Sequence, residues 1–307
     1  MRCNPEKLHS YSYAAIDPVP AMSRIPALLL LVLPLLGGMV FSGEYYYEVP
    51  YEGEESLHAE LKLALGRVFV EKAEPDYLFQ AEVRLEKDGL TPHFSYERED
   101  NVGYVRLGLD GSKEEDSFQL HHLSDLRASE WRIYLGDRVP NDVRMKLAMA
   151  EGHLDFSGIA LRSLDIECGV TRSRLRFSEP NPVPMRVLNI DAGASEFIAE
   201  GLGFSRAAYI SFNGGMGSFS LDLTGGAFPE GAEVDISMGM GKLTVTLPRE
   251  EAVVLELPSS WLLKTDIPVG YTKKGPGLWY NEYVRDPEAA LRVRIKASMG
   301  VVQLRVR

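Results

Sequence analysis

The stretch Ser211–Leu223, SFNGGMGSFSLDL, places three glycines between two runs in which apolar and polar residues alternate. A phosphate-binding loop would need a Lys-Ser or Lys-Thr pair and a helix after its glycines, whereas a strand-like pattern follows here. A calcium-binding nonapeptide repeat would need aspartates among the glycines, which this stretch lacks. Because glycine permits positive φ and lets backbones approach closely, the stretch predicts a tight corner between two strands.

The same pattern recurs in seven segments. They begin at Ala59, Met145, Leu164, Leu188, Ile210, Val234 and Val293. Each has a large apolar residue two positions after its start and small residues five and seven positions after it. Most have apolar residues again nine and eleven positions after the start. In the segment at Leu164 these apolar residues come two positions later, at Leu175 and Phe177, as if two residues were inserted. The starts from Met145 to Val234 are 19, 24, 22 and 24 residues apart, which is the length of one solenoid coil.

Each segment is therefore expected to form a short strand of period two, a small-residue corner and a second short strand. One such unit has too little apolar surface to fold alone, whereas stacked units bury a continuous core. The sequence predicts an all-β fold in which short strands stack into a β-helix- or solenoid-like architecture. A β-sandwich is the alternative.

The chain divides into three parts: residues 1–42, an irregular β region at 43–142, and the glycine-cornered repeat region at 143–307. An aromatic excursion at 251–290 interrupts the repeats. In the irregular region, YLFQAEVRLE, PHFSYERE, VGYVRLGL and EWRIYLG are rich in β-forming residues and are predicted strands. The acidic, tyrosine-rich segment Glu44–Ser56 is either a flexible lead-in or an edge strand.

Residues 1–42 have the pattern of a signal peptide. Arg24 precedes the apolar run 25–36, and cleavage is expected after Ser42. Met22 is the expected true start. The apolar run is shorter than the roughly 20 residues of a membrane span, so the protein is expected to be exported to the periplasm, the cell surface or the medium. It contacts the membrane only if this leader stays uncleaved.

Composition narrows the classes of partner. The chain has 307 residues, 45% hydrophobic, and a net charge of −11, so it can bury a substantial core and is expected to repel nucleic acid. Its two cysteines, Cys3 and Cys168, cannot supply a disulfide framework or the usual zinc site.

The repeat region resembles a known family. DVRMKLAMAEGHLDFSGIALRSLDIECGVTRSRLRFSEPN, LNIDAGASEFIAEGL, ISFNGGMGSFSLDLTG and VDISMGMGKLTVTLP are similar to the toast-rack family of bacterial exported proteins and to the C-terminal domain of LiaF-type antibiotic-response proteins. The resemblance covers about residues 56–307. It implies a stacked all-β architecture, an envelope location and no established enzymatic activity, and it supplies no catalytic residues. LiaF-type proteins carry several N-terminal membrane helices, whereas this chain has only the leader.

Outward positions of the repeat are expected to form two polar columns. One contains Glu167, Asp191, Asn213, Ser237 and Lys296, and the other contains Asp165, Asn189, Ser211, Asp235 and Arg294. Such columns would place polar groups about 4.8 Å apart on neighbouring strands. A face that binds cations or sugars is one interpretation, but a solvated polar ladder is favoured because the two acids in each mixed column do not make the close pair of a glycosidase.

Other reactive residues show no catalytic or metal-binding arrangement. Cys168 lies in an apolar column and is expected to be a buried, inert thiol. His121 and His122 are adjacent on a predicted strand and so point to opposite faces, and the remaining histidines lack ligand spacing. They are His58, His93 and His153. Serines such as Ser259 and Ser260 show no nucleophile elbow. We therefore expect no catalytic residue, metal or cofactor.

The aromatic excursion is the best candidate for a binding surface. Its aromatic residues are Trp261, Tyr271, Trp279, Tyr280 and Tyr283, and Lys264, Lys273, Lys274 and Arg285 lie nearby. Aromatics beside cations suit glycan stacking or a protein partner. The alternative, which we favour, is a flap that caps the open end of the core.

The predicted function is that of a non-enzymatic exported envelope protein, a structural or interaction scaffold whose partner is an envelope protein or a cell-wall glycan. A polysaccharide-binding or polysaccharide-active β-helix is the alternative. A role in envelope-stress response is implied by the family resemblance alone.

Overall fold

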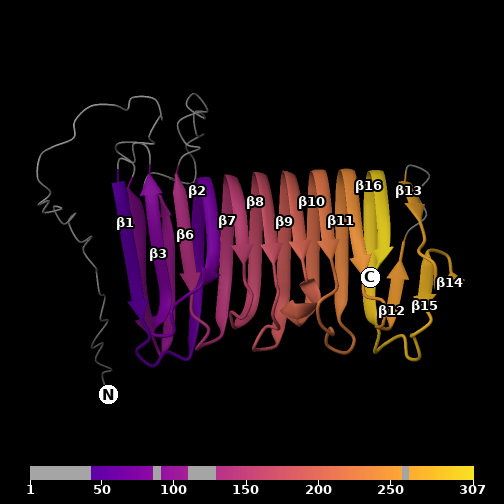
Figure 1. Ribbon diagram of the computed structural model, residues 1–307, viewed down its shortest axis with the longest axis horizontal. Coiled ribbons are helices and arrows are strands. Elements are labelled where there is room, and N and C mark those ends of the chain that lie inside the picture. Colours follow the sequence, from indigo (N-terminus) through magenta and orange to yellow (C-terminus); the bar gives the residue numbers. More distant parts are fainter. Residues whose placement is uncertain (1–42, 86–90, 110–128, 258–262) are drawn as a thin grey trace, which may run out of the picture.

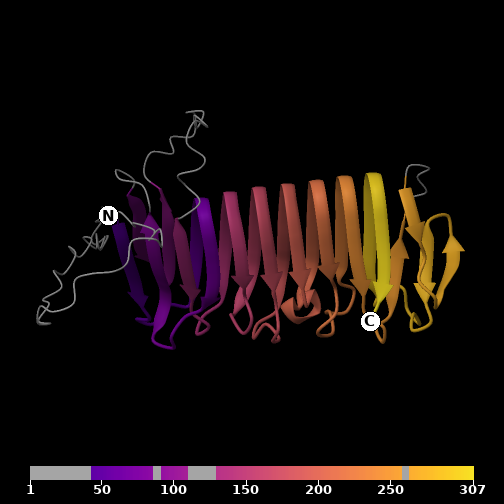
Figure 2. The same ribbon diagram turned by 45° about the horizontal axis from the view of Figure 1, so that its top comes forward.

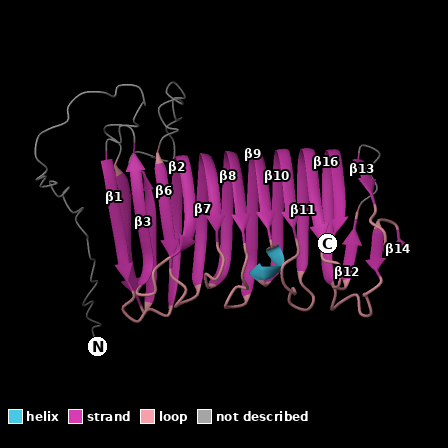
Figure 3. Cartoon of the chain, in the orientation of Figure 1, coloured by secondary structure: helices cyan, strands magenta, loops and turns pink. Residues whose placement is uncertain are grey.

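The computed structural model describes residues 43–85, 91–109, 129–257 and 263–307. Its strands form a single sixteen-stranded sheet, and the one other regular element among these residues is the short 3₁₀ helix η2 (Leu202–Ser205). Figure 3 shows the strands side by side along the long axis of the molecule. In the same residues, no helix is long and apolar enough to cross a membrane. The all-β prediction is confirmed.

Seven long strands form the centre of the sheet, each parallel to its neighbours. In spatial order they are β2 (Ser56–Lys72), β7 (Asn141–Asp155), β8 (Leu161–Arg176), β9 (Met185–Glu200), β10 (Ala207–Asp222), β11 (Glu233–Leu247) and β16 (Leu291–Val306). In Figure 1 their corners lie along the upper edge and the connecting loops along the lower edge.

Each long strand folds back on itself, so that its two halves face each other (Figure 2). Phe212 and Phe219 belong to the same strand, yet their ring centroids are 5.3 Å apart, whereas an extended strand would separate them by roughly 23 Å. In β9, Ala192 and Ser195 are both buried, with exposed residues 193 and 194 between them. We call one folded strand a rung, and its halves the first arm and the second arm.

Strand register confirms the repeat, with one correction. Ala59 lies opposite Val143, and Val143 lies opposite Leu164. The second segment therefore begins at Val143, not at Met145, and the first interval is 21 residues rather than 19. A shift of two residues preserves the period of a strand, so the apolar pattern alone did not exclude it.

The two-residue insertion expected after Leu164 is also absent from the structure. Ser173 pairs in register with Gly152 on one side and Phe197 on the other. Ser173 is itself buried, 3% exposed. The second arms of β7 and β8 thus place small side chains where the later rungs place phenylalanine, leucine or valine, which is why the apolar pattern is interrupted there.

The corner is part of a continuous strand, not a break between two short ones. Pairing runs through it, with Met216 opposite Met240 and Gly217 opposite Gly241. Gly241 has φ 134°, and a Cβ added to it would lie 1.9 Å from the carbonyl oxygen of Gly217. Glycine at these corners is therefore required by both the left-handed backbone and the close approach of the neighbouring rung, as the opening stretch predicts.

The core lies between the two arms of the rungs. Phe212 is fully buried and contacts Phe197 of the preceding rung, with ring centroids 6.0 Å apart. Trp131 is the largest fully buried side chain, and its Nε1 donates a hydrogen bond of 3.0 Å to the carbonyl oxygen of Leu65. One continuous apolar cluster runs through the molecule, which is the burial that stacked repeats need.

Five strands build the N-terminal end. They are β1 (Gly43–Pro50), β3 (Tyr77–Leu85), β4 (Pro92–Glu99), β5 (Val102–Leu109) and β6 (Glu130–Leu135). The four strands predicted in the irregular region are β3 to β6. β5 pairs with the first arm of β2 and β6 with its second arm, while β1 is the edge strand beyond β3. The sheet is continuous across residues 142 and 143, because β2 also pairs with β7 along its length.

The C-terminal end is built from β12 (Val253–Glu256), β13 (Leu263–Asp266), β14 (Tyr271–Gly275) and β15 (Leu278–Asn281). β12 pairs with the first arm of β16, and β13 pairs with its second arm. Together they form an incomplete eighth rung inside the excursion. The last strand of the sequence, β16, lies between β11 and β12.

Buried asparagines join the loops that return from one rung to the next. The side-chain amide of Asn181 donates to the carbonyl oxygens of Leu161 and Ser205, at 2.7 and 3.1 Å, and its Oδ1 accepts from the Leu161 amide at 3.0 Å. Asn181 thus satisfies backbone groups of two neighbouring loops that would otherwise be buried without partners.

Candidate functional site

The outer surface of the first arms carries the two polar columns that the sequence predicts. Asp191 pairs in register with Glu167 on one side and Asn213 on the other, and Ser237 and Lys296 continue this column. The second column runs from Asp165 to Arg294 in the same way. We call this surface the ladder face.

Charges on the ladder face are paired from rung to rung. Lys146 Nζ lies 2.8 Å from Glu167, and the Asn213 amide donates a hydrogen bond of 2.8 Å to Asp191. Arg144 lies 3.5 Å from Asp165. The carboxylates therefore contact cationic or amide groups of adjacent rungs, which fits the solvated ladder better than a cation-binding row.

At its C-terminal end the ladder face is centred on Arg294. Its guanidinium lies 2.8 Å from Glu233, 3.1 Å from Asp235 and 3.4 Å from Glu256. The hydrogen bond from Arg294 lowers the pKa of Glu233. Because Glu256 comes from β12, this cluster links the incomplete eighth rung to the two rungs beside it.

At the N-terminal end, Asp142 is the centre of a second cluster. It accepts hydrogen bonds from Arg162 and Ser163, and the His58 imidazole lies 3.6 Å away. Asp142, Ser163 and His58 border a hollow of 380 Å³ that Tyr104 and Arg106 also line. No sequence pattern indicates this cluster, because Asp142 lies just before the position at which its repeat begins.

Asp142 provides a pH-dependent prediction. Burial raises its pKa, but the hydrogen bonds from Arg162 and Ser163 and the nearby charges outweigh burial and leave the pKa below the ordinary value. A lowered carboxyl pKa stabilises the fold above about pH 3.9, and the stabilisation is lost as pH falls through the folded-state pKa. Asp142→Asn is expected to cost about 1 to 3 kcal/mol at pH 7, and less as the medium is acidified below about pH 4.

Urea unfolding at a series of pH values measures this effect. Asp76→Asn is the matched control, because Asp76 pairs with Arg138 at 2.9 Å but is 88% exposed, and an exposed pair is worth about 0 to 1 kcal/mol. The account of Asp142 is contradicted if Asp142→Asn loses the same unfolding free energy at pH 3 as at pH 7. It is also contradicted if that loss is no larger than the loss in Asp76→Asn.

Two of the histidines, His58 and His153, take part in stacking. His58 stacks on Tyr104 and His153 on Phe69, with ring centroids 5.2 Å apart in each pair. His121 and His122 lie outside the described residues. Within the described ranges, no group of three or more His, Cys, Asp or Glu residues is placed to hold a metal ion.

Cys168 faces the core and is 5% exposed. Burial raises the pKa of its thiol to about 11. Because the thiolate is the nucleophile, we expect iodoacetamide at pH 8 to alkylate Cys168 in the folded chain about 100-fold or more slowly than in the chain unfolded in guanidinium. Mass spectrometry of the peptide that contains Cys168 measures both rates, and equal rates would contradict the burial of this thiol.

The structure separates the aromatic residues of the excursion. Tyr271 and Trp279 pack against the core, and burial raises the pKa of the Tyr271 hydroxyl. Tyr280 is partly buried, whereas Tyr283 is 41% exposed. Trp261 lies outside the described residues. The assignment of these five residues to a binding surface stays a prediction.

β14 and β15 form an antiparallel hairpin at the end of the sheet. Lys273 Nζ lies over the Trp279 ring, 5.7 Å from its centroid. Tyr271 and Trp279 come from the two strands of this hairpin and both cover the core from the end. The hairpin therefore contains the capping arrangement that an open solenoid end needs, together with an aromatic and cationic pair on its surface.

Two solved structures are similar to this chain. A candidate cell adhesion protein from Clostridium sporogenes is 17% identical, with 86% of this chain and 99% of that chain covered and a TM-score of 0.44. A candidate adhesin from Bacteroides fragilis is 10% identical, with 86% and 97% covered and a TM-score of 0.28. The chain matches no curated protein.

The family is shown by the match over residues 41–197, just over half of the chain, to the N-terminal domain of toast_rack, DUF2154. This range runs from β1 through β8 and most of β9, so it includes the N-terminal end of the sheet and the first rungs. The resemblance found in the sequence is confirmed at the level of the family, and the chain belongs to the toast-rack family.

Proposed function

We propose that this protein is a non-enzymatic, exported scaffold of the cell envelope that presents a rigid, regular surface to a partner. The observation that carries the proposal is the pairing of charges along the ladder face, where carboxylates such as Glu167 and Asp191 are engaged by neighbouring rungs. A catalytic carboxylate must be positioned to act on a substrate, whereas these groups hold adjacent rungs together.

An assay for cleavage of cell-wall polysaccharides tests whether the protein is non-enzymatic. The purified full chain is incubated with peptidoglycan and with acidic and neutral cell-wall polysaccharides, and released reducing ends are measured. The proposal predicts no release above a heat-denatured sample. Release that is abolished in Glu167→Gln or Asp191→Asn would contradict it and would favour a polysaccharide-active β-helix.

Export is supported by the sequence pattern of residues 1–42, in which Arg24 precedes the apolar run 25–36. Fractionation of producing cells, followed by N-terminal sequencing of the exported form, is expected to give a chain that starts at Gly43. A cytoplasmic chain that retains residues 1–42 would contradict export.

A role in envelope-stress response rests on the family resemblance. Deletion of the gene is expected to change the response of the producing cells to antibiotics that act on the cell wall, and re-expression of the wild-type chain should restore it. An unchanged response in the deleted strain would remove this role while leaving the scaffold proposal in place.

Glycan binding at the C-terminal hairpin is the second candidate function, and the partly exposed Trp279 beside Lys273 supports it. Retention of the protein on cell-wall glycan is expected to fall in Trp279→Ala and Trp261→Ala. Tyr46→Ala is the matched control, since Tyr46 is 61% exposed on β1 at the opposite end of the sheet. Equal retention of all three variants and the wild type would exclude the hairpin as the binding surface.

A further inference from the structure

A column of apolar residues runs along the corners of the rungs; its first member, Leu65, is buried, whereas Val170, Met216, Met240 and Met299 are exposed. Its members each lie six positions after the start of a rung, and pairing places them side by side. In spatial order they are Leu65, Met149, Val170, Ala194, Met216, Met240 and Met299. We call them the crest column. Three consecutive rungs, β10, β11 and β16, carry methionine there.

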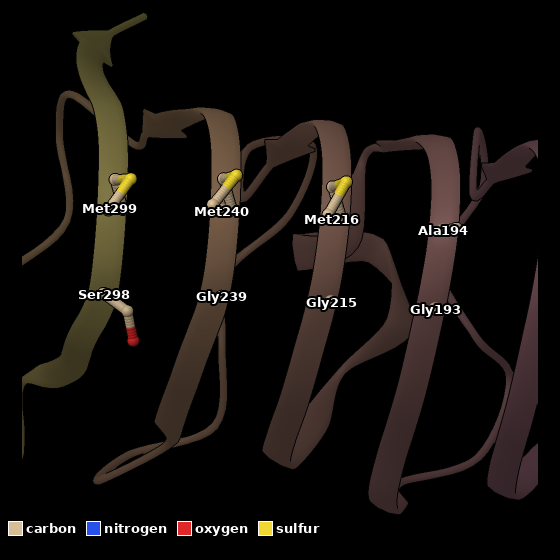
Figure 4. A pocket seen from close by; sticks show the side chains of 8 residues that line it. All are labelled: Gly193, Ala194, Gly215, Met216, Gly239, Met240, Ser298 and Met299. Atoms are coloured by element: carbon tan, nitrogen blue, oxygen red, sulfur yellow. The ribbon is translucent and has the colours of Figure 1, made fainter.

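The three methionines are unusually exposed for their type. Met216, Met240 and Met299 are 59%, 43% and 46% exposed. Figure 4 shows that their side chains point the same way, with the sulfur atoms along one line across adjacent rungs. Exposed apolar clusters in a soluble protein commonly mark an interaction site.

The methionines border a hollow of 570 Å³ along the crest. Its remaining lining is Gly193, Ala194, Gly215, Gly239 and Ser298. These residues have small side chains or none, so the thioether sulfurs are the main side-chain donor atoms that face the hollow, and the Ser298 hydroxyl is the other one. Backbone forms the floor of the hollow. Its N–H and C=O groups already take part in the pairing between adjacent rungs.

Other rungs show that the corner position does not itself demand methionine. Leu65 and Val170 take the same place in their rungs, and Val170 is 58% exposed. Strands favour β-branched residues, so an apolar crest could be built from valine throughout. Methionine differs from valine and leucine by its polarisable thioether and its three rotatable bonds.

We propose that Met216, Met240 and Met299 together bind one Cu(I) ion. Neighbouring parallel strands lie about 4.8 Å apart, so modest rotations of the outer two side chains bring all three sulfur atoms around an ion above Met240. Thioethers are soft ligands that select Cu(I), whereas carboxylate, carbonyl and water suit hard ions such as Mg²⁺ and Ca²⁺.

The charges beside the crest do not attract a cation, so the affinity must come from the thioether sulfurs. Lys242 is the charged residue of the adjoining column in these rungs, with Ser218 and Val301 opposite it, and the chain as a whole carries a net charge of −11. Thioethers bind without releasing a proton. Binding at this site is therefore independent of pH between about 5.5 and 8, unlike binding to cysteine or histidine.

The test uses the full chain with Cys3→Ala and Cys168→Ala, so that no thiol competes for the metal. Methionine methyl groups are labelled with ¹³C, and Ag(I), a redox-inert ion of the same charge and softness, is added under NMR observation. The methyl signals of Met216, Met240 and Met299 are expected to shift together and to saturate at one equivalent. Zn²⁺ should leave these signals in place.

Cu(I) affinity is measured without oxygen, by competition with a chromophoric chelator. The triple variant Met216→Leu, Met240→Leu, Met299→Leu nearly conserves volume and apolar surface, so it removes the sulfur while keeping the shape of the crest. Its Cu(I) affinity should fall by more than about 100-fold, the upper range for loss of a supporting residue. Met22→Leu with Met39→Leu is the control and should bind as tightly as the parent.

Several results would overturn the proposal. One is that the methyl signals of Met216, Met240 and Met299 do not shift when Ag(I) is added. The same holds if they shift independently, with one ion bound for each methionine. Another is a triple leucine variant that retains the affinity of the parent, since an apolar docking surface tolerates leucine and a thioether site does not. Affinity that drops steeply on acidification to pH 5.5 would assign the ion to other ligands.

Discussion

The Gly241→Ala variant is expected to lose about 2 to 6 kcal/mol of unfolding free energy, the combined range for backbone strain and overpacking. Its φ of 134° is a conformation that residues with a Cβ rarely adopt. The added methyl would also lie 1.9 Å from the carbonyl oxygen of Gly217. Backbone pairing fixes that oxygen, so neither strand can move aside without breaking the ladder between β10 and β11.

Denaturant unfolding measures this loss, with Gly275→Ala as the matched control. Gly275 has no positive φ, and a Cβ there would make an ordinary contact of 3.8 Å with Leu278. The control is expected to change stability by less than about 0.5 kcal/mol. If both variants unfold at the same denaturant concentration as the wild type, the corner geometry is wrong.

The Phe212→Ala variant is expected to lose about 3 to 5 kcal/mol, the usual cost of a large-to-small change at a buried phenylalanine. Phe212 is fully buried and contacts Phe219 of its own second arm and Phe197 of the preceding rung. The cavity would therefore open between both arms and between two rungs, where neighbouring backbones are held by pairing and cannot collapse into it.

Tyr46→Ala serves as its control, because Tyr46 is an exposed aromatic residue on the edge strand β1. That change is expected to cost less than about 0.5 kcal/mol. Differential scanning calorimetry compares the two variants with the wild type. Equal midpoints for Phe212→Ala and Tyr46→Ala would mean that the arms of β10 do not enclose a core.

The repeat made most of the fold predictable from sequence. Small residues five and seven positions into each segment mark the corner, because backbone approach there is a local requirement that each rung must meet. Strands β3 to β6 were also predictable from alternation, whereas the segment that forms β1 allowed either an edge strand or a flexible lead-in. The order of the C-terminal strands was not, since the insertion of β16 between β11 and β12 depends on pairing between distant segments, which no local pattern records.

The two-residue error at the second segment had a consequence for the site. With a start at Met145, the sixth position of that segment is Glu151, and the crest column is broken there. With the true start at Val143, the sixth position is Met149, and the column is apolar in every rung. The β7 member of the crest column is therefore recognised only once register is known, whereas Met216, Met240 and Met299 already follow from the segment starts at Ile210, Val234 and Val293.

The polar columns of the ladder face were predictable for the same reason as the corner, because outward positions follow from the period of a strand. Their pairing was not, because salt bridges such as that of Arg294 with Glu256 join residues from strands that are distant in sequence. The cluster at Asp142 likewise depends on Arg162 of the next rung, and alternation gives no signal for it.

The central claim is that each long strand folds back so that its two arms enclose the core. An NMR measurement of cross-relaxation between the ring protons of Phe212 and Phe219, in deuterated protein with protonated phenylalanine rings, tests it directly. Phe212→Leu assigns the signals. Ring centroids 5.3 Å apart predict a strong cross-peak between the two rings. An absent cross-peak would mean an extended strand, with the rings roughly 23 Å apart, and would contradict the account.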